Sequence, residues 1–328
     1  MDCMHRLCVA PMLDWTDRHC RSFLRILAPK ALLYTEMVVA EAVLHGRREA
    51  LLGHDASEQP LALQLGGSDP RQLAAAVTLA RPWGFDEFNL NLGCPSDRVQ
   101  SGRFGAVLMK SPGQVADCIR AMREAAGEVP VTAKIRIGVD EYDSEEFLQA
   151  FVAVLAETGV STVIVHARKA WLKGLSPREN REVPPLDYGR VLRLQQAFPQ
   201  LRIVLNGGIA TLEDALKWSE CMPGIMLGRA AYQNPWLLCR LHGRLFPETP
   251  LPASRREAVE RFLPYVARHC AAGTALHHIS RHMLGLFQGV AGARRWRRML
   301  TEGARKPGVG PGLLMQALEA VEEGEMGH

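Results

Sequence analysis

The chain has 328 residues, of which 47% are hydrophobic and 23% are charged, and its formal net charge is +4. This is the composition of an ordinary globular protein, so it excludes a chain that is disordered throughout. No apolar run approaches the roughly 18 to 20 residues that a membrane-spanning helix needs, and the first residues lack the apolar core of a secretory signal.

The eight cysteines are scattered along the chain and form no C-x-x-C pair. This spacing is typical of a reduced cytosolic protein and not of a disulfide framework or a cysteine zinc site. His278 and His282 are spaced four apart, but no acidic or cysteine ligand accompanies them, so a polar helix face explains them better than a metal site. We therefore expect a cytoplasmic protein with no metal, no membrane partner and no evident protein partner.

Short apolar runs alternate with amphipathic stretches from the start of the chain to about residue 245. The expected strands cover residues 7–12, 32–38, 61–66, 85–92, 131–137, 162–168, 203–208 and 224–229. Helical patterns lie between them, as at 70–81, 112–126 and 144–158. Eight such units predict an α/β fold, a closed (β/α)8 TIM barrel, and no G-x-G-x-x-G motif supports an open dinucleotide-binding sheet.

Two segments interrupt this regular spacing, at 94–111 and 168–186. Each follows a strand, so in a barrel both loops emerge at the carboxyl ends of the strands, where active sites lie. After a linker at 246–254 the strand patterns stop, and residues 255–325 read as helices. We therefore predict a catalytic barrel domain at 1–246 and a helical domain at 247–328.

Polar residues and turn residues gather at the expected carboxyl ends of the strands. They are Pro11, Met12 and Leu13 after the first strand, then Gln64, Asn91, Lys134, His166, Asn206, Gly207, Gly208, Gly228 and Arg229. Polar groups in a barrel interior are costly unless they bind something. The glycines after the seventh and eighth strands suit the phosphate site that recurs in this fold, although turns need glycine as well.

Lys134 and Cys94 are the residues in this set with the most specific chemistry. In barrels that bind a flavin, a cation near the flavin ring stabilises the anionic reduced form of the ring, and Lys134 suits this role. The alternative is that Lys134 forms an ion pair with a neighbouring carboxylate. Cys94 follows the fourth strand, a position that suits proton transfer or nucleophilic attack, although a free cysteine is commonly a small core residue.

The positive charge is concentrated near the end of the chain. Residues 251–310 contain 11 Lys and Arg against three acidic residues, a net +8. This block fits either a phosphate-rich partner or a solvated arginine-rich helix surface. Trp296 lies inside it and suits either stacking on RNA or packing in a core.

Long motifs carry a family resemblance. The segment NLNLGCPSDRVQSGRFGA, with APM, KIRIG, VHAR, LNGGI and GIMLGRAAYQNPW, resembles the bacterial tRNA-dihydrouridine synthases over residues 7 to about 300. The loop VHARKAWLKGLSPRENREVPPLDY is similar to the A-type subfamily, which acts at positions 20 and 20a of the tRNA D loop.

The resemblance implies an FMN enzyme that reduces uridine in tRNA with NADPH as electron donor. Cys94 matches the family's acid, which protonates C5 of uracil while reduced flavin delivers hydride to C6, and Asn91 matches an asparagine beside the target base. The resemblance implies flavin contacts for a larger set, namely Pro11, Met12, Leu13, Gln64, Lys134, His166, Asn206, Gly207, Gly208, Gly228 and Arg229. For tRNA, charge placement suggests Arg178 and Arg181 on the long loop and Arg294, Arg295, Arg297 and Arg298 in the basic block.

Two other functions remain open from the sequence. A flavin dehydrogenase of the dihydroorotate type shares the glycines and the lysine but has no need of the basic block. An RNA-binding module with an inactive barrel needs the basic block but not Cys94, Lys134 and His166 together.

Overall fold

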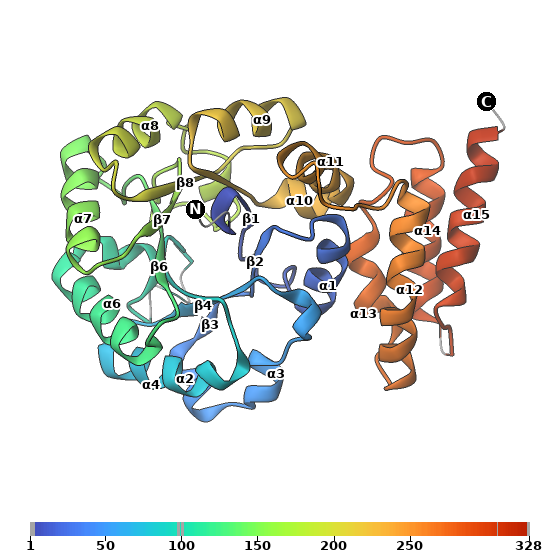
Figure 1. The fold of residues 1–328 in the computed structure, drawn as a ribbon, viewed down its shortest axis with the longest axis horizontal. Helices are drawn as coiled ribbons and strands as arrows, with labels where there is room; N and C mark the ends of the chain where they lie inside the picture. The colour runs from blue at the N-terminus through green and yellow to red at the C-terminus, as the bar shows by residue number, and fades with distance from the viewer. Residues whose placement is uncertain (1–3, 97–98, 100–101, 307, 327–328) are drawn as a thin grey trace.

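The computed structural model describes residues 4–96, 99, 102–306 and 308–326, and their side chains up to residue 321. In this part of the chain nine parallel strands form one sheet, which closes because β2 pairs with both β1 and β4. The strands are β1 (Leu7–Val9), β2 (Leu32–Tyr34), β3 (Val38–Val39), β4 (Leu61–Gly66), β5 (Glu87–Leu92), β6 (Val131–Arg136), β7 (Thr162–His166), β8 (Arg202–Asn206) and β9 (Gly224–Leu227). Since β2 and β3 are two pieces of the second barrel strand, the predicted TIM barrel is confirmed (Figure 1).

The strand boundaries differ from the expected ones at several places. The expected strand 32–38 is divided into β2 and β3, and between them the hydroxyl of Thr35 accepts a hydrogen bond from the N–H of Gln64 at 3.1 Å. The expected strand 85–92 begins only at Glu87, and several others end before their last expected residues. These last residues, such as Pro11, Gly207 and Gly228, belong to the turns after the strands.

Helices surround the barrel between the strands. They are α1 (Arg18–Leu27), α2 (Ala40–His45), α3 (Arg48–Leu52), α4 (Pro70–Ala80), α6 (Pro112–Ala126), α7 (Glu145–Glu157), α8 (Tyr188–Ala197), α9 (Leu212–Cys221), α10 (Arg229–Gln233) and α11 (Pro235–Leu245). Short 3-10 helices are η1 (Met4–Arg6), η2 (Ala56–Glu58), η3 (Arg81–Trp83), η4 (Gly105–Lys110) and η5 (Glu179–Arg181).

Local signals define the helices that were predicted with the correct bounds. The expected helix 112–126 coincides with α6, which has Pro112 in its first turn and is followed by Gly127 at φ +64°. α7 begins after Ser144, whose hydroxyl accepts a hydrogen bond from the N–H of Phe147 at 3.1 Å, as expected for an N-cap.

The chain ends in a group of helices on one side of the barrel (Figure 1). They are α12 (Arg255–Ala271), α13 (Leu276–Ser280), η6 (Arg281–Met283), α14 (Ala293–Glu302), η7 (Gly303–Arg305) and α15 (Gly312–Met326). Among the residues with described placement, no helix combines the length and apolar character needed to cross a membrane. The division into domains at 246/247 stays a prediction, and residues 1–3, 307, 327 and 328 of the two predicted domains lie outside the described residues.

A polar contact joins these helices to the loop after β1. Asp17 accepts a hydrogen bond from Arg281 at 2.7 Å and lies 3.0 Å from Nε2 of His282. Trp15 stacks on Tyr232, with ring centroids 4.3 Å apart. His282 is only 1% exposed, so the interpretation of this histidine as part of a polar helix face is wrong. The part of the chain that the structure describes contains no group of three or more His, Cys, Asp or Glu arranged to hold a metal ion.

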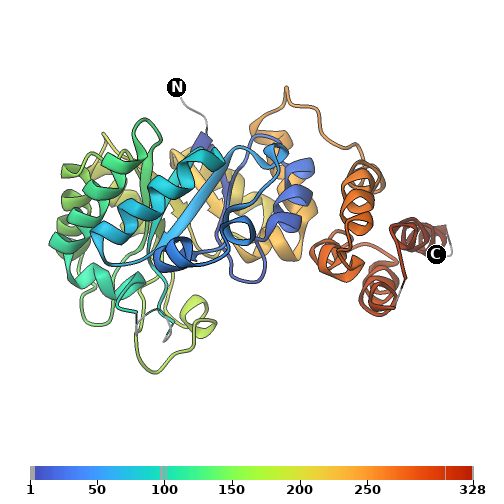
Figure 2. The ribbon, with the colours of Figure 1, turned by 90° about the horizontal axis from the view of Figure 1, so that it is seen from below.

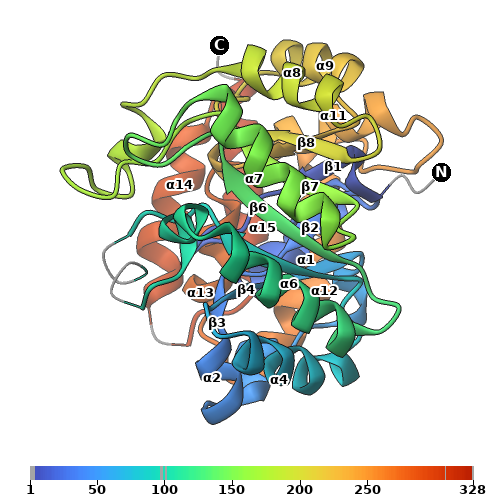
Figure 3. The same cartoon turned by 90° about the vertical axis from the view of Figure 1, so that its left-hand side faces the viewer.

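The two long loops project from the same end of the barrel, opposite the N-terminus (Figure 2). The loop 168–186 contains η5, and the loop 94–111 contains η4, although residues 97, 98, 100 and 101 of the latter lie outside the described residues. α13 and α14 lie toward this end as well (Figures 2 and 3). The carboxyl ends of the strands, both long loops and the basic helix α14 therefore occupy one side of the molecule.

Candidate active site

The interior of the barrel contains a small apolar cluster, and polar side chains gather at the carboxyl ends of the strands. One buried cluster inside the barrel consists of Cys8, Ala10, Leu32, Tyr34, Ala62, Ile164, Val204 and Met226, with Met4 packed against it. At the carboxyl end, strand pairing places Asn91 beside Lys134 and His166 beside both Arg136 and Asn206. The sequence-predicted residues Asn91, Lys134, His166 and Asn206 therefore lie on four consecutive strands, β5 to β8.

Cys94 lies two residues after the end of β5 and is half-buried. Hydrogen bonds fix its backbone at both the N–H and the carbonyl. Its N–H donates to Oδ1 of Asn91 at 3.0 Å, and its carbonyl accepts from the N–H of Ala106 at 2.9 Å. Its sulfur lies 3.5 Å from the hydroxyl of Ser96. Gly105 has φ +76°, and a Cβ there would lie 2.5 Å from the Cys94 carbonyl oxygen, so only glycine fits against this cysteine.

Lys134 lies next to Cys94 among other cations. Its ammonium makes neither a hydrogen bond nor an ion pair with any described residue, so the alternative of a carboxylate partner finds no support. Burial, together with the charges of Arg136 and Arg181, lowers the pKa of Lys134 to about 7, while Cys94 opposes them. A buried amine without a counter-ion fits a site that receives an anionic or electron-rich ligand.

Two arginines extend this positive region, and His166 lies among these cations with an uncharged ring. Burial, followed by the charges of Arg136 and Lys134, lowers the pKa of His166 well below its usual value. Arg136 donates to the carbonyls of Gly93 at 2.9 Å and Asn180 at 2.8 Å, so it connects the two long loops. Nε of Arg168 is buried and has no hydrogen-bond partner among the described residues. Sequence reasoning assigned no role to Arg168, although it is the last residue of the motif VHAR.

The glycines after β8 form a close backbone approach. Gly207 has φ +110° and Gly208 has φ +70°. A Cβ on Gly207 would lie 2.4 Å from Cδ2 of His166, and the carbonyl of Gly207 accepts a hydrogen bond from Tyr188 at 2.7 Å. Left-handed backbone of this kind exposes N–H groups that suit a phosphate.

We expect Gly207→Ala to lower the free energy of unfolding by about 1–3 kcal/mol, because it combines backbone strain with a clash against His166. Chemical denaturation measures this loss. Gly113→Ala is the matched control, since a Cβ at Gly113 meets nothing within 4 Å. A Gly207 variant as stable as the Gly113 variant would contradict the strain.

Other predicted cofactor residues have partners within the protein. The amide of Asn206 donates to the carbonyl of Met226 at 2.8 Å, so it holds β8 against β9. Arg229 pairs with Glu182 of the long loop. Gly228 caps α10, and Met12 accepts hydrogen bonds from the N–H groups of Trp15 and Thr16. Pro11 is half-buried beside Met12, and Leu13 is 69% exposed in the same turn.

The predicted tRNA residues lie on two separate elements. Arg178 directly precedes η5 and Arg181 is its last residue. Arg178 pairs with Glu182, and Arg181 lies close enough to influence Lys134. Exposed arginines on α14 form the second group, which consists of Arg294, Arg295, Arg297 and Arg298. Arg295 donates to the carbonyl of Ala320 at 2.9 Å and so helps to hold α15.

Trp296 is not available to stack on RNA. It is fully buried, and its indole N–H donates to the carbonyl of Met283 at 2.9 Å, because its position on α14 faces the other C-terminal helices. Sequence reasoning missed the aromatic side chains that are exposed, Tyr142 at 45% and Trp171 at 37%. They lie in the loops after β6 and β7, with Lys110 and Lys169 over their rings.

The family model described as "Dihydrouridine synthase (Dus)" matches residues 8–322. The chain belongs to the dihydrouridine synthase family. It is therefore an enzyme of a family whose named members act on tRNA, and its motifs around Cys94, Lys134 and His166 were assigned to the correct family.

Full-length relatives support this membership. The chain is 52% identical over 324 residues to "tRNA-dihydrouridine(20/20a) synthase" of Vibrio cholerae, and the aligned residues make up 98% of each protein. It is 54% identical over 320 residues to the protein of the same name from Xanthomonas campestris, and the aligned residues make up 97% of this chain and 94% of the relative.

A solved structure supports the fold alone. The old yellow enzyme homologue of Zymomonas mobilis superposes with a TM-score of 0.52 at 14% identity, covering 75% of this chain and 89% of that one. Both chains share the barrel architecture.

Proposed function

We propose that this protein reduces the C5–C6 double bond of the uridines at positions 20 and 20a in the tRNA D loop, with FMN as its cofactor and NADPH as the electron donor. Membership of the dihydrouridine synthase family supports tRNA dihydrouridine synthesis by a flavin-dependent enzyme. The observation that carries the finer assignment is the pair formed by Cys94, held by Asn91, and the unpartnered ammonium of Lys134.

The residues at the carboxyl ends of the strands fit FMN. Lys134 supplies a cation and the unpaired Nε of Arg168 a donor, while the lowered pKa of His166 leaves its ring uncharged. The described part of this region offers Lys134 no carboxylate partner. We assign Pro11, Met12, Leu13 and Gln64 to the ring, and Gly207, Gly208, Gly228 and Arg229 to the phosphate, with Asn206 supporting that end through Met226. Bound there, FMN would supply hydride to C6 of the uracil.

The chain's own residues supply the proton and the position of the base. The thiol of Cys94 donates its proton to C5 and later recovers one from solvent, which makes Cys94 the general acid. The backbone hydrogen bond from Cys94 to Asn91 holds the cysteine at the end of β5. Since a uridine in folded tRNA lies inside the stack, we expect it to be extruded into the site.

Surface features at the same end of the barrel suit RNA. Tyr142 and Trp171 offer exposed rings for base stacking, and Arg178 and Arg181 lie on the same loop as Trp171. α14 adds a basic helix toward this end (Figure 3). A small-molecule dehydrogenase has no use for these features, and an inactive RNA-binding barrel has no use for Cys94 with Lys134.

The direct test combines the purified protein with NADPH and tRNA from cells that lack the gene. The protein is expected to carry FMN and to form dihydrouridine at positions 20 and 20a, as mapped by mass spectrometry of the digested tRNA. A colourless protein, or a yellow protein that leaves both positions unmodified, would contradict the proposal.

We expect the substitutions Arg294→Gln and Arg298→Gln together to weaken tRNA binding and to lower its salt dependence by about one unit per lost phosphate contact. These two arginines are exposed and make no hydrogen bond or ion pair within the described chain, whereas Arg295 also holds Ala320. The binding isotherm at several salt concentrations gives the slope, and FMN content is expected to stay unchanged.

Arg240 and Arg244 provide a matched control for this pair. They have the same spacing and are exposed, but lie on α11 at the outside of the barrel. If the control pair lowers affinity as much as the α14 pair, the charge effect is general and α14 does not bind tRNA.

A further inference from the structure

A continuous chain of hydrogen bonds runs through the barrel interior from its amino end to Cys94. The hydroxyl of Thr132 donates to Glu87 at 2.5 Å, and Nδ2 of Asn89 donates to Thr132 at 2.8 Å. Nε2 of Gln64 then donates to Oδ1 of Asn89 at 2.7 Å. Finally, Nδ2 of Asn91 donates to Oε1 of Gln64 at 2.7 Å, and Oδ1 of Asn91 accepts from the N–H of Cys94. We call these five side chains, Glu87, Thr132, Asn89, Gln64 and Asn91, the polar relay.

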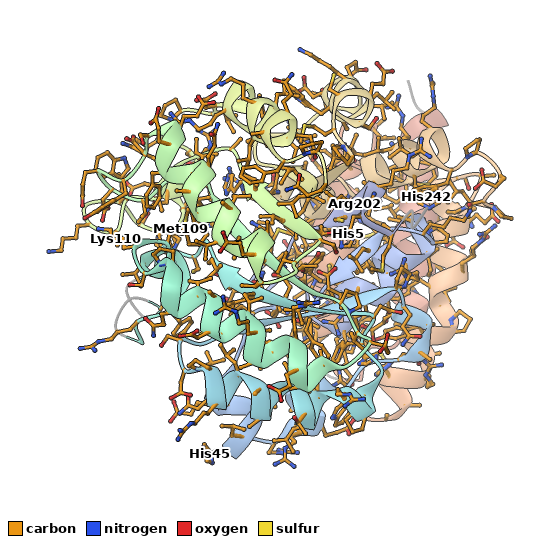
Figure 4. All side chains as sticks on the ribbon, turned by 60° about the vertical axis from the view of Figure 1, so that its left-hand side comes forward. His5, His45, Met109, Lys110, Arg202 and His242 are labelled. Carbon is orange, nitrogen blue, oxygen red and sulfur yellow. The ribbon has the colours of Figure 1, made fainter. Side chains whose placement is uncertain are left out.

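The relay is buried along its whole length. Glu87, Asn89 and Thr132 have no exposed surface, Gln64 is 1% exposed, and Asn91 is 8% exposed at the top. Glu87 also accepts from Tyr34 at 2.7 Å and lies 2.5 Å from Nε2 of His5. His5 lies near Arg202, away from Lys110, which lies on η4 in the loop that begins at Cys94 (Figure 4). The relay therefore connects the amino end of the barrel to the active site.

In all five hydrogen bonds the donor lies on the side of Cys94 and the acceptor on the side of Glu87. The chemistry of the groups at the two ends of the relay requires this direction. A carboxylate can only accept, so the hydroxyl of Thr132 donates to Glu87 and accepts from Asn89. At the other end the backbone N–H groups of Gly93 and Cys94 can only donate, so Oδ1 of Asn91 faces them. Reversing any one amide between these ends would bring two donors or two acceptors together in a dry interior, which is costly.

The direction of these hydrogen bonds determines whether the amides of Gln64 and Asn91 can donate a hydrogen bond to a ligand or accept one from it. The oxygens of Gln64 and Asn91 are both occupied by donors of the relay or the backbone. Each side-chain nitrogen uses one hydrogen in the relay and has a second one. Both amides therefore present N–H donors, which match the carbonyl oxygens of a pyrimidine ring, as found in uracil and in the flavin ring system.

We infer that Glu87 is a positioning residue, which acts through Thr132 and Asn89 to fix the amides of Gln64 and Asn91 as hydrogen-bond donors toward the active site. The inference rests on the proposed function for the identity of the ligand, but the relay itself rests on the hydrogen bonds within the chain. Glu87 touches no substrate and takes no part in proton transfer.

Thr132→Val tests the relay because it removes the one hydroxyl between Glu87 and Asn89 with little change in shape. Tyr34→Phe is the matched control, since it removes a hydroxyl that donates to the same Oε1 of Glu87 but lies outside the relay. Thr132→Ser restores the hydroxyl. The readouts are the dissociation constant of FMN, the KM and kcat for tRNA, and the melting temperature.

The inference predicts that Thr132→Val weakens FMN binding roughly tenfold and raises the KM for tRNA, because an unanchored amide can turn its oxygen toward the ligand. Thr132→Ser and Tyr34→Phe are expected to stay within about twofold of the wild type in both constants. Thr132→Val and Tyr34→Phe are expected to lower the melting temperature by similar amounts, so that stability does not explain the difference. If Thr132→Val and Tyr34→Phe have the same dissociation constant for FMN and the same KM for tRNA, the inference is overturned.

A second measurement separates this inference from the proposed function. In the protein as purified, the side-chain NH2 groups of Gln64 and Asn91 are expected to exchange hydrogen with solvent faster in Thr132→Val than in wild type or Thr132→Ser. Unchanged exchange in Thr132→Val would overturn the relay even if the enzyme makes dihydrouridine. If exchange is faster in Thr132→Val but the wild-type enzyme leaves tRNA unmodified, the relay is retained and the proposed function is rejected.

Discussion

Cys94→Ala should still accept electrons from NADPH at close to the wild-type rate, while its turnover of tRNA falls by about 10²–10⁴-fold, the usual contribution of a general acid. The reason is that the thiol is needed only when the uracil takes up a proton at C5. Stopped-flow absorbance of the flavin measures the first half-reaction, and single-turnover formation of dihydrouridine measures the second.

Cys221→Ala serves as the control for this variant, because Cys221 is a free, exposed cysteine at the end of α9. Its two half-reactions should both match the wild type. If Cys94→Ala lowers both half-reactions equally, the side chain of Cys94 instead supports the structure of the loop after β5, through the contact of its sulfur with the hydroxyl of Ser96.

Lys134→Met should weaken FMN binding by roughly 10- to 100-fold, the value of a hydrogen bond to a charged group. It should also make the FMN-free protein more stable. Burial lowers the pKa of Lys134 to about 7, below the value of about 10.4 for an unfolded chain. The folded state therefore disfavours the ammonium, and this cost is fully present below pH 7 and disappears as the pH rises past the unfolded pKa.

The expected result is a free energy of unfolding for FMN-free Lys134→Met that exceeds wild type by on the order of 1–4 kcal/mol at pH 6, with the difference vanishing near pH 10–11. Denaturation curves at several pH values measure it. Lys173→Met, an exposed lysine of the long loop, is the control and should change neither FMN affinity nor stability. A Lys134 variant that binds FMN normally, with a flat pH dependence, would contradict the role assigned to this lysine.

The glycine and cap signals explain why the helices were predicted well. α6 and α7 follow from Pro112, Gly127 and Ser144, each of which acts on its own backbone neighbours within a few residues. The position of Cys94 at the end of a strand was equally readable, because the strand before it is a run of alternating residues that ends at a glycine and a proline.

What the sequence by itself determined is thus the barrel, the approximate positions of its strands and the family to which the chain belongs. The tertiary structure alone decided which polar side chains find partners within the protein and which of the described ones, such as Lys134, do not. Asn206 and Asn91 were alike in the sequence, yet Asn206 holds β9 and Asn91 holds the N–H of Cys94. Trp296 was ambiguous until packing buried it, and the relay from Glu87 to Cys94 joins residues of β4, β5 and β6. The physical reason is that helix caps and strand periodicity act between neighbours in the chain, whereas hydrogen-bond partners, burial and pKa shifts depend on strands that meet only when the barrel closes.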